Sequence, residues 1–258
     1  MPDFIDLGGI RTAFEAAGDG PPLLMLHGAE GSRRQFEAVR AHLADRFTVI
    51  TYDQRDCGDT TGALQPATLA ELADDAAALL EVLGHGSAFV FGTSFGGRVA
   101  QALAVRHPAR VRRLVLAHTW PLAVSIGEAN PEVAREIARL RAELPASAEA
   151  LAALFHPPAF LAAHPAARAH FKSAPARSAR SERRAAAVED RPALDIATIT
   201  QPTLLIAGEL DRVVPMALTL SLAEPLRDSR TVVLPGVGHL SLAQVPEVVA
   251  GHVRAFCA

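Results

Sequence analysis

Short apolar runs alternate with amphipathic segments along most of the chain, and this alternation predicts strands connected by helices. Residues 3–16 alternate apolar and polar positions around two glycines, which predicts a β-hairpin at a sheet edge. Buried strands are predicted at 23–26, 47–52, 87–91, 111–117, 202–208 and 231–234. Helices are predicted at 33–45, 68–83, 98–107 and 215–223, and from 246 onward. This order implies right-handed crossovers and a mainly parallel sheet with helices on both faces.

The alternation breaks between residues 119 and 198, where no strand is predicted. Leu, Phe and Ile recur there at helical spacing, which favours a helical insertion over a disordered linker. Prolines separate the predicted helices, which lie at 131–143, 147–155 and 159–171. Residues 172–191 are rich in Ser, Ala, Arg and Glu. We therefore expect a core formed by 1–118 and 199–258 with a helical cap at 119–198.

Composition excludes some classes of partner but does not indicate a reaction. The 258 residues are 50% hydrophobic and carry a formal net charge of −3, which argues against nucleic acid or an anionic membrane as the main partner. No secretory signal or long apolar run is visible, and the two cysteines, Cys57 and Cys257, fit a reduced compartment. We expect a cytoplasmic protein, and we predict no oligomeric state.

One glycine-rich turn carries the strongest chemical signal. Residues 92–97 read Gly-Thr-Ser-Phe-Gly-Gly and lie between a predicted strand and a predicted helix. A nucleophile elbow needs this arrangement, because small neighbours allow the serine to adopt a strained backbone conformation. The alternative is an ordinary glycine-rich turn, since Gly-x-Ser-x-Gly also occurs by chance.

Further motifs follow other predicted strands. They are His27-Gly28, Asp53-Gln54-Arg55, Gly208-Glu209-Leu210-Asp211 and Gly236-Val237-Gly238-His239. With the elbow, they make the chain resemble the α/β-hydrolase fold over its whole length, and in particular serine hydrolases with a helical cap such as enol-lactonases, esterases and cofactor-free haloperoxidases. The resemblance implies an α/β fold with a mainly parallel eight-stranded sheet.

The same resemblance implies a catalytic triad. Ser94 would be the nucleophile, His239 the general base, and Asp211 the carboxylate that orients the imidazole, in the chain order of the family. Loops at the carboxyl ends of parallel strands can bring such distant residues together. Carboxylates that compete with Asp211 for this role are Asp190, Asp195 and Glu209.

The resemblance also implies an oxyanion hole made by the backbone N–H groups of Ala29 and Phe95. His27 is interpreted as a structural side chain that bonds neighbouring loops. One loop departs from the family, because relatives usually carry Arg-Gly-x-Gly-x-Ser where residues 55–60 read Arg-Asp-Cys-Gly-Asp-Thr. Substrate preference therefore cannot be carried over from relatives.

Several residues have a structural and a functional interpretation. Arg98 lies one turn after Ser94 and is expected to pair locally, with contact to an acidic substrate as the alternative. His118 and Trp120 lie where the core gives way to the cap, so they either line the substrate pocket or pack in the core. Cys57 is expected to be an inert thiol. The arginines between 177 and 191 are interleaved with acids, which predicts a solvated face.

These residues favour hydrolysis of a small carboxylic ester, lactone or thioester through an acyl-enzyme on Ser94. Other serine-dependent reactions of the fold remain open, namely perhydrolysis (cofactor-free haloperoxidase) and hydrolysis of carbon–carbon bonds in ring-fission products. A ligand receptor on a hydrolase scaffold is the non-enzymatic alternative. No His/Cys cluster has metal-ligand spacing, and we expect no cofactor and no metal.

Overall fold

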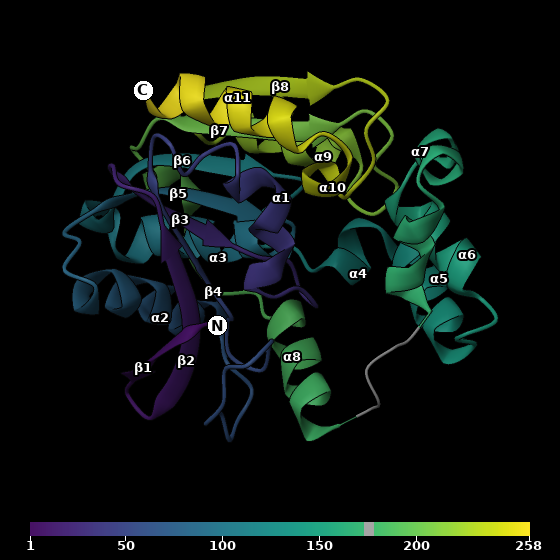
Figure 1. Ribbon diagram of the computed structural model, residues 1–258, viewed down its shortest axis with the longest axis horizontal. Helices are drawn as coiled ribbons and strands as arrows, with labels where there is room; N and C mark the ends of the chain where they lie inside the picture. Colours follow the sequence, from purple (N-terminus) through teal and green to yellow (C-terminus); the bar gives the residue numbers. More distant parts are fainter. Residues whose placement is uncertain (173–177) are drawn as a thin grey trace.

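An eight-stranded sheet runs through the centre of the computed structural model, which describes residues 1–172 and 178–258, the side chain of His170 excepted (Figure 1). The strand order is β1-β2-β4-β3-β5-β6-β7-β8. The strands are β1 (Asp3–Leu7), β2 (Ile10–Ala17), β3 (Pro22–Leu26), β4 (Thr48–Tyr52), β5 (Ala88–Thr93), β6 (Val111–Ala117), β7 (Thr203–Gly208) and β8 (Ser229–Leu234). Strand β2 pairs antiparallel with β1 and β4, and every other neighbour is parallel. The predicted edge hairpin and mainly parallel sheet are confirmed.

Helices cover both faces of the sheet, and successive side chains of each strand point to opposite faces. In β3, Leu24 and Leu26 join the core under α2 and α3, whereas Leu23 and Met25 join the core under α1 and α11. The core helices are α1 (Glu37–Arg40), α2 (Leu69–Val82), α3 (Phe95–Arg106), α9 (Met216–Leu220), α10 (Ser241–Gln244) and α11 (Pro246–Cys257). The sheet is therefore buried on both sides, as continuous apolar runs predict.

Helix boundaries follow local capping where the sequence supplies it. A capping box begins α2, since the Thr68 hydroxyl accepts from the Glu71 amide at 3.1 Å and the Glu71 carboxylate accepts from the Thr68 amide at 2.8 Å. The single helix predicted over 33–45 is wrong. A 3₁₀ turn (Arg33–Phe36) and the short α1 stand there, followed by turns in which the amides of His42 and Leu43 bond carbonyls three residues back, in place of the four-residue spacing of an α-helix.

A helical insertion joins β6 to β7, and its described residues contain no strand. Its helices are α4 (Ile126–Ala129), α5 (Pro131–Ala142), α6 (Ala148–Phe155), α7 (Pro158–Ala163) and α8 (Ala179–Glu189), with 3₁₀ turns at Pro165–Phe171 and Ile196–Thr198. The helix predicted over 159–171 is broken because Pro165 cannot continue α7.

The insertion has two parts. Helices α5 and α6 enclose a small apolar cluster of Leu140, Leu151 and Leu154, and α7 packs beside them. Helix α8 lies apart from that group, in the lower part of the view of Figure 1. Among the described helices, none has the length and apolarity that a bilayer crossing requires.

Candidate active site

Ser94 lies on a sharp turn between β5 and α3. Its backbone angles are φ 54° and ψ −126°, a conformation that a non-glycine residue adopts only under strain. The flanking glycines are required by space: a Cβ on Gly92 would lie 2.4 Å from the Gly96 carbonyl oxygen, and one on Gly96 would lie 2.1 Å from the Leu26 oxygen. The turn therefore has the geometry of the predicted elbow.

Three side chains from three loops form one hydrogen-bonded row. The Ser94 Oγ lies 3.0 Å from His239 Nε2, and His239 Nδ1 lies 2.9 Å from Asp211 Oδ2. Asp211 follows β7 and His239 follows β8, so parallel pairing places all three at the same edge of the sheet. An ionised Asp211 accepts from Nδ1–H, which leaves Nε2 to accept the serine hydroxyl proton.

Asp211 is a buried carboxylate with an unusually complete set of donors. Its Oδ1 accepts the amides of Val213 and Val214, each at 2.9 Å, and its Oδ2 accepts from His239 and His118. Burial raises the pKa of this carboxyl, but the charge of His239 and the hydrogen bonds from His118 and His239 outweigh burial. The pKa of Asp211 therefore lies below its usual range, and the group stays ionised.

His118 is the residue that sequence reasoning misread. It directly follows β6, has φ 51°, and is fully buried. The expectation that His118 lines the substrate pocket is therefore corrected. Its Nδ1 donates to Asp211 Oδ2 at 3.0 Å, and its Nε2 accepts from the Ser241 hydroxyl at 2.8 Å. Burial lowers the pKa of His118, which keeps the ring neutral. The sequence signal that could have indicated this role is the position of His118 directly after a predicted parallel strand, since Ser94 also directly follows such a strand.

Trp120 and Arg98 also belong to the core. Trp120 is 2% exposed and donates its Nε1 to the Val124 carbonyl, which corrects the expectation that it lines a pocket. Arg98 is fully buried near the Trp120 ring and donates to the carbonyls of Leu122, Val188 and Asp190. The expectation that Arg98 pairs locally is therefore wrong, because these carbonyls lie 24, 90 and 92 positions away.

The competing carboxylates have other partners. Asp190 accepts the Leu69 amide at 2.7 Å, Asp195 accepts the Ala197 amide at 2.9 Å, and Glu209 accepts the Gly236 amide at 2.8 Å. Asp211 is the carboxylate that bonds His239.

The loop after β3 lies beside the serine. A Cβ on Gly28 would be 3.5 Å from the Ser94 Cβ, so this loop and the first amide of α3 border the same space. The Phe95 N–H is the first of α3 and has no partner within its own helix. The loop that carries Ala29 and the amide of Phe95 therefore both lie beside Ser94, and the oxyanion hole that they would form stays a prediction.

His27 bonds backbone on both sides of its ring. Its Nδ1 donates to the Gly28 carbonyl at 2.8 Å, and its Nε2 accepts the Gln54 amide at 3.0 Å. Burial lowers the pKa of His27 to about 3, and the charge of Arg184 adds to the shift. The structural interpretation of His27 is confirmed. Cys57 is buried, and burial raises the pKa of its thiol, which fits the expected inert thiol.

The predicted solvated face of arginines is wrong for α8. Arg184 is 5% exposed and bonds the loop after β3, Arg183 pairs with Asp56, and Arg180 donates to the Gly58 and Thr60 carbonyls. The sequence did not reveal these contacts because their partners lie more than a hundred positions away. Arg177 lies outside the described residues.

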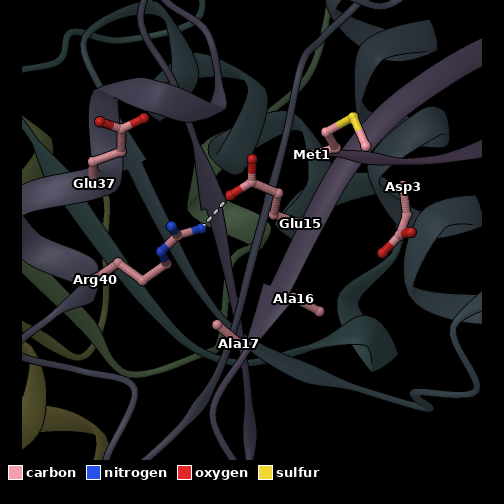
Figure 2. A pocket seen from close by; sticks show the side chains of 7 residues that line it. All are labelled: Met1, Asp3, Glu15, Ala16, Ala17, Glu37 and Arg40. Carbon is pink, nitrogen blue, oxygen red and sulfur yellow. Dashed lines mark hydrogen bonds and ion pairs between the residues drawn. The ribbon is translucent and has the colours of Figure 1, made fainter.

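Two surface cavities do not include Ser94. One of about 420 Å³ lies at the amino-terminal hairpin and α1, where Arg40 reaches Glu15 (Figure 2). The other, of about 350 Å³, is lined by Asp211 and its neighbours in the loop after β7 and by residues at the ends of α6 and α7, without Ser94 or His239. The side chains that line them contain no partner for Ser94, so we assign neither to the serine site.

The row around Asp211 also offers metal ligands. Atoms of His118, Asp211 and His239 lie within 4.8 Å of one another. An ion between them would have to displace the hydrogen bonds that now join the carboxylate to both rings, so the geometry is that of a hydrogen-bonded network. The expectation of no metal stays a prediction.

Comparison with known proteins decides the family. The family model described as the alpha/beta hydrolase fold matches residues 21–245. The chain belongs to the α/β-hydrolase fold family. It is a hydrolase of that family, and the expected fold class, with eight strands flanked by helices, is confirmed.

Individual relatives span nearly the whole chain. A protein of Azorhizobium caulinodans named as a carbamate hydrolase, RutD, is 32% identical over 95% of this chain and 94% of its own length. A thermophilic esterase from Thermogutta terrifontis has a TM-score of 0.82 at 29% identity, covering 100% of this chain and 98% of that one. The enol-lactonase of Burkholderia xenovorans shares the fold, with a TM-score of 0.83 at 22% identity over 99% of each chain.

Proposed function

We propose that this hydrolase cleaves a carboxylic ester or lactone of a small molecule through an acyl-enzyme on Ser94. The observation that carries the proposal is the unbroken row from Ser94 Oγ through His239 to Asp211, with a strained serine at its head. Relatives that include an esterase support the same chemistry.

The first half of the reaction forms the acyl-enzyme. Ser94 Oγ attacks the carbonyl carbon while its proton passes to His239 Nε2. Asp211 stabilises the imidazolium, and the N–H groups of Ala29 and Phe95 bind the negative oxygen of the tetrahedral intermediate. The carbon–oxygen bond of the leaving group breaks, and the leaving alkoxide takes the proton from His239.

The second half releases the acid. A water molecule gives its proton to His239 Nε2 and attacks the acyl carbon, again through an oxyanion held by the two N–H groups. The Ser94–acyl bond breaks, and Ser94 recovers the proton from His239. The helical insertion at 119–198 acts in this proposal as the cap that covers the site.

A carbamate is the second candidate substrate, because the relative named as a carbamate hydrolase is 32% identical over nearly the whole chain. Carbamates present the same carbonyl carbon to the serine, so the triad and the oxyanion hole would act on them in the same way. With a phenyl carbamate the group left on Ser94 would be a carbamoyl group, and its hydrolysis would release a carbamic acid.

The test is turnover of p-nitrophenyl acetate, a set of lactones, a phenyl carbamate and a ring-fission dienone by the purified protein. We expect Ser94→Ala to lower kcat by about 10⁴-fold or more, because removal of a triad nucleophile has effects of that size. Ser221→Ala, which removes an exposed serine hydroxyl, is the matched control and should leave kcat unchanged.

Labelling with a fluorophosphonate gives a second readout at Ser94. Turnover that survives in Ser94→Ala would contradict the proposed nucleophile. Absence of both turnover and labelling across the set would favour a ligand receptor, and turnover of the dienone alone would favour carbon–carbon hydrolysis.

A further inference from the structure

Helix α8 reaches from the insertion into the oxyanion side of the site. We infer that Arg184 is a positioning residue for the oxyanion hole, which orients and polarises the Gly28–Ala29 peptide so that the Ala29 N–H can bind the substrate oxyanion. This inference rests on the proposed function. Its basis is direct contact: Arg184 Nε donates to the Ala29 carbonyl at 2.6 Å, and Nη2 donates to the Gly28 carbonyl at 3.3 Å.

Peptide geometry connects these bonds to the N–H group. The Gly28 carbonyl and the Ala29 N–H belong to the same trans peptide and point in opposite directions. His27 Nδ1 and the Gly31 amide also donate to the Gly28 carbonyl, at 2.8 and 3.2 Å, so three donors fix the carbonyl edge of this peptide. Holding that edge fixes the direction of the Ala29 N–H.

The charged guanidinium of Arg184 donates mainly to backbone carbonyl groups. Among the described residues, the structure shows no ion pair between Arg184 and a carboxylate; its other contacts are Gln54 Oε1 at 3.1 Å and the face of the Phe95 ring, 4.5 Å from the guanidinium carbon. A charged donor polarises the peptide whose oxygen it binds, which makes the N–H of that peptide a stronger donor. Arg184 thus touches both residues that supply the oxyanion hole.

Two further arginines hold α8 in register. Arg180 lies one helical turn before Arg183 and Arg184, at spacings of three and four residues, so it shares a helix face with both. Arg183 Nη2 lies 2.6 Å from Asp56 Oδ1, and Arg180 Nη2 donates to the Gly58 carbonyl at 2.8 Å. Asp56 has φ 63° and stands where relatives usually carry glycine. The loop that departs from the family is therefore the loop that receives the arginines of α8.

The test compares Arg184→Met, which keeps the length but removes charge and donors, with Arg184→Lys, which keeps the charge. Arg139→Met is the matched control, because Arg139 is exposed and pairs within α5. With p-nitrophenyl acetate, we expect Arg184→Met to lower kcat about 10–50-fold with KM within about 2-fold, less than the loss of a whole oxyanion donor. Arg184→Lys should recover part of kcat, and Arg139→Met should match the wild type.

Inhibitors distinguish a role of Arg184 in positioning the oxyanion hole from a role in holding α8 against the core. A phenylboronic acid that forms a tetrahedral adduct with Ser94 should lose affinity in Arg184→Met in parallel with kcat, whereas inhibition by the acetate product should change little. Equal weakening of both inhibitors, or a lower melting temperature with unchanged kcat, would overturn the inference.

Hydrogen–deuterium exchange gives a readout that needs no activity. We expect amides of residues 27–31 to exchange faster in Arg184→Met than in the wild type or Arg139→Met, with Arg184→Lys in between. Unchanged exchange in this loop would overturn the inference even if the esters are turned over. Failure of the wild type to turn over any ester would instead overturn the proposed function. If Arg184→Met does not fold, the comparison of Arg184→Lys with the wild type decides.

Discussion

The two sides of Ser94 are built in different ways. On the acid–base side, Asp211, His239 and His118 all directly follow or closely follow strands, and the hydrogen bonds of the sheet fix where those strands end. On the oxyanion side, the loop after β3 is held by His27 and by Arg184, which comes from the insertion.

The two sides would therefore affect different parts of the proposed reaction, proton transfer on one side and stabilisation of the oxyanion on the other. In the proposed reaction, proton transfer depends mainly on where the strands end, although the insertion also contacts the base, because the His239 amide donates to the Phe155 carbonyl of α6 at 3.0 Å. Stabilisation of the oxyanion depends in addition on how α8 docks. Changes in α8 can therefore alter the rate without moving the strand ends that carry the triad.

The largest expected effect lies on the acid–base side, at His118. His118→Ala removes a donor that orients the carboxylate of the triad, and loss of a residue that orients a reacting group typically costs about 10–100-fold in activity, so kcat should fall by about that factor. His118→Asn should keep part of kcat, because Asn tolerates a positive φ and carries N–H donors. His252→Ala, a partly exposed histidine on α11, is the control.

The pH profile tells positioning from packing. Burial raises the pKa of Asp211, and His239 and His118 lower it below its usual range, so loss of His118 moves that pKa upward. The general base must be neutral for activity, and without the donor from His118 more of the Asp211 charge acts on the protonated His239 ring, so the acidic limb of kcat/KM should shift to higher pH in His118→Ala. A lower kcat with an unshifted acidic limb would mean that His118 acts through packing alone.

An intermediate effect is expected on the oxyanion side, in the acid stability that His27 controls. Burial lowers the pKa of His27 to about 3, whereas an exposed histidine titrates near 6.5. Below pH ~6.5 the unfolded chain binds a proton at this histidine, whereas the folded chain binds it only near pH 3. The free energy of unfolding therefore falls as the pH drops through this range. Between pH 7 and 4.5 the loss from this residue should be about 2–3 kcal/mol.

Urea unfolding at both pH values checks this prediction. His27→Gln should lower stability at pH 7 by removing the bonds to Gly28 and Gln54, and it should lose less stability on acidification than the wild type. Buried His118, whose pKa is also lowered, contributes in the same direction and remains in both proteins. Equal pH dependence in the two proteins would contradict the predicted role of His27.

The smallest effect is expected at Asp56, where the insertion meets the core. Asp56→Gly removes the pair with Arg183 but relieves a non-glycine residue at φ 63°, so the free energy of unfolding should change by less than about 1 kcal/mol. Thermal unfolding of this variant and of Asp56→Asn measures it. A fall in kcat as large as that of Arg184→Met would show that the register of α8 depends on Asp56.

Elements set by neighbours in the sequence were predictable. Thr68 and Glu71 cap α2 through a three-residue spacing, and the apolar run in β3 fits a strand buried on both faces. The segment at 33–45 was predicted only in part, because its apolar spacing fits a helix but does not show that bonds such as the one from the Leu43 amide to the Arg40 carbonyl break it into turns.

The sequence by itself determined the elbow around Ser94 and the order of serine, carboxylate and histidine, because glycine spacing and the alternation of strands and helices are local properties. Only the tertiary structure decided what His118 and Arg184 do. Their partners Asp211 and Ala29 lie 93 and 155 positions away, and a buried polar side chain takes its role from the groups that satisfy it. Both contacts exist because parallel strands end at one edge of the sheet and α8 folds back onto that edge.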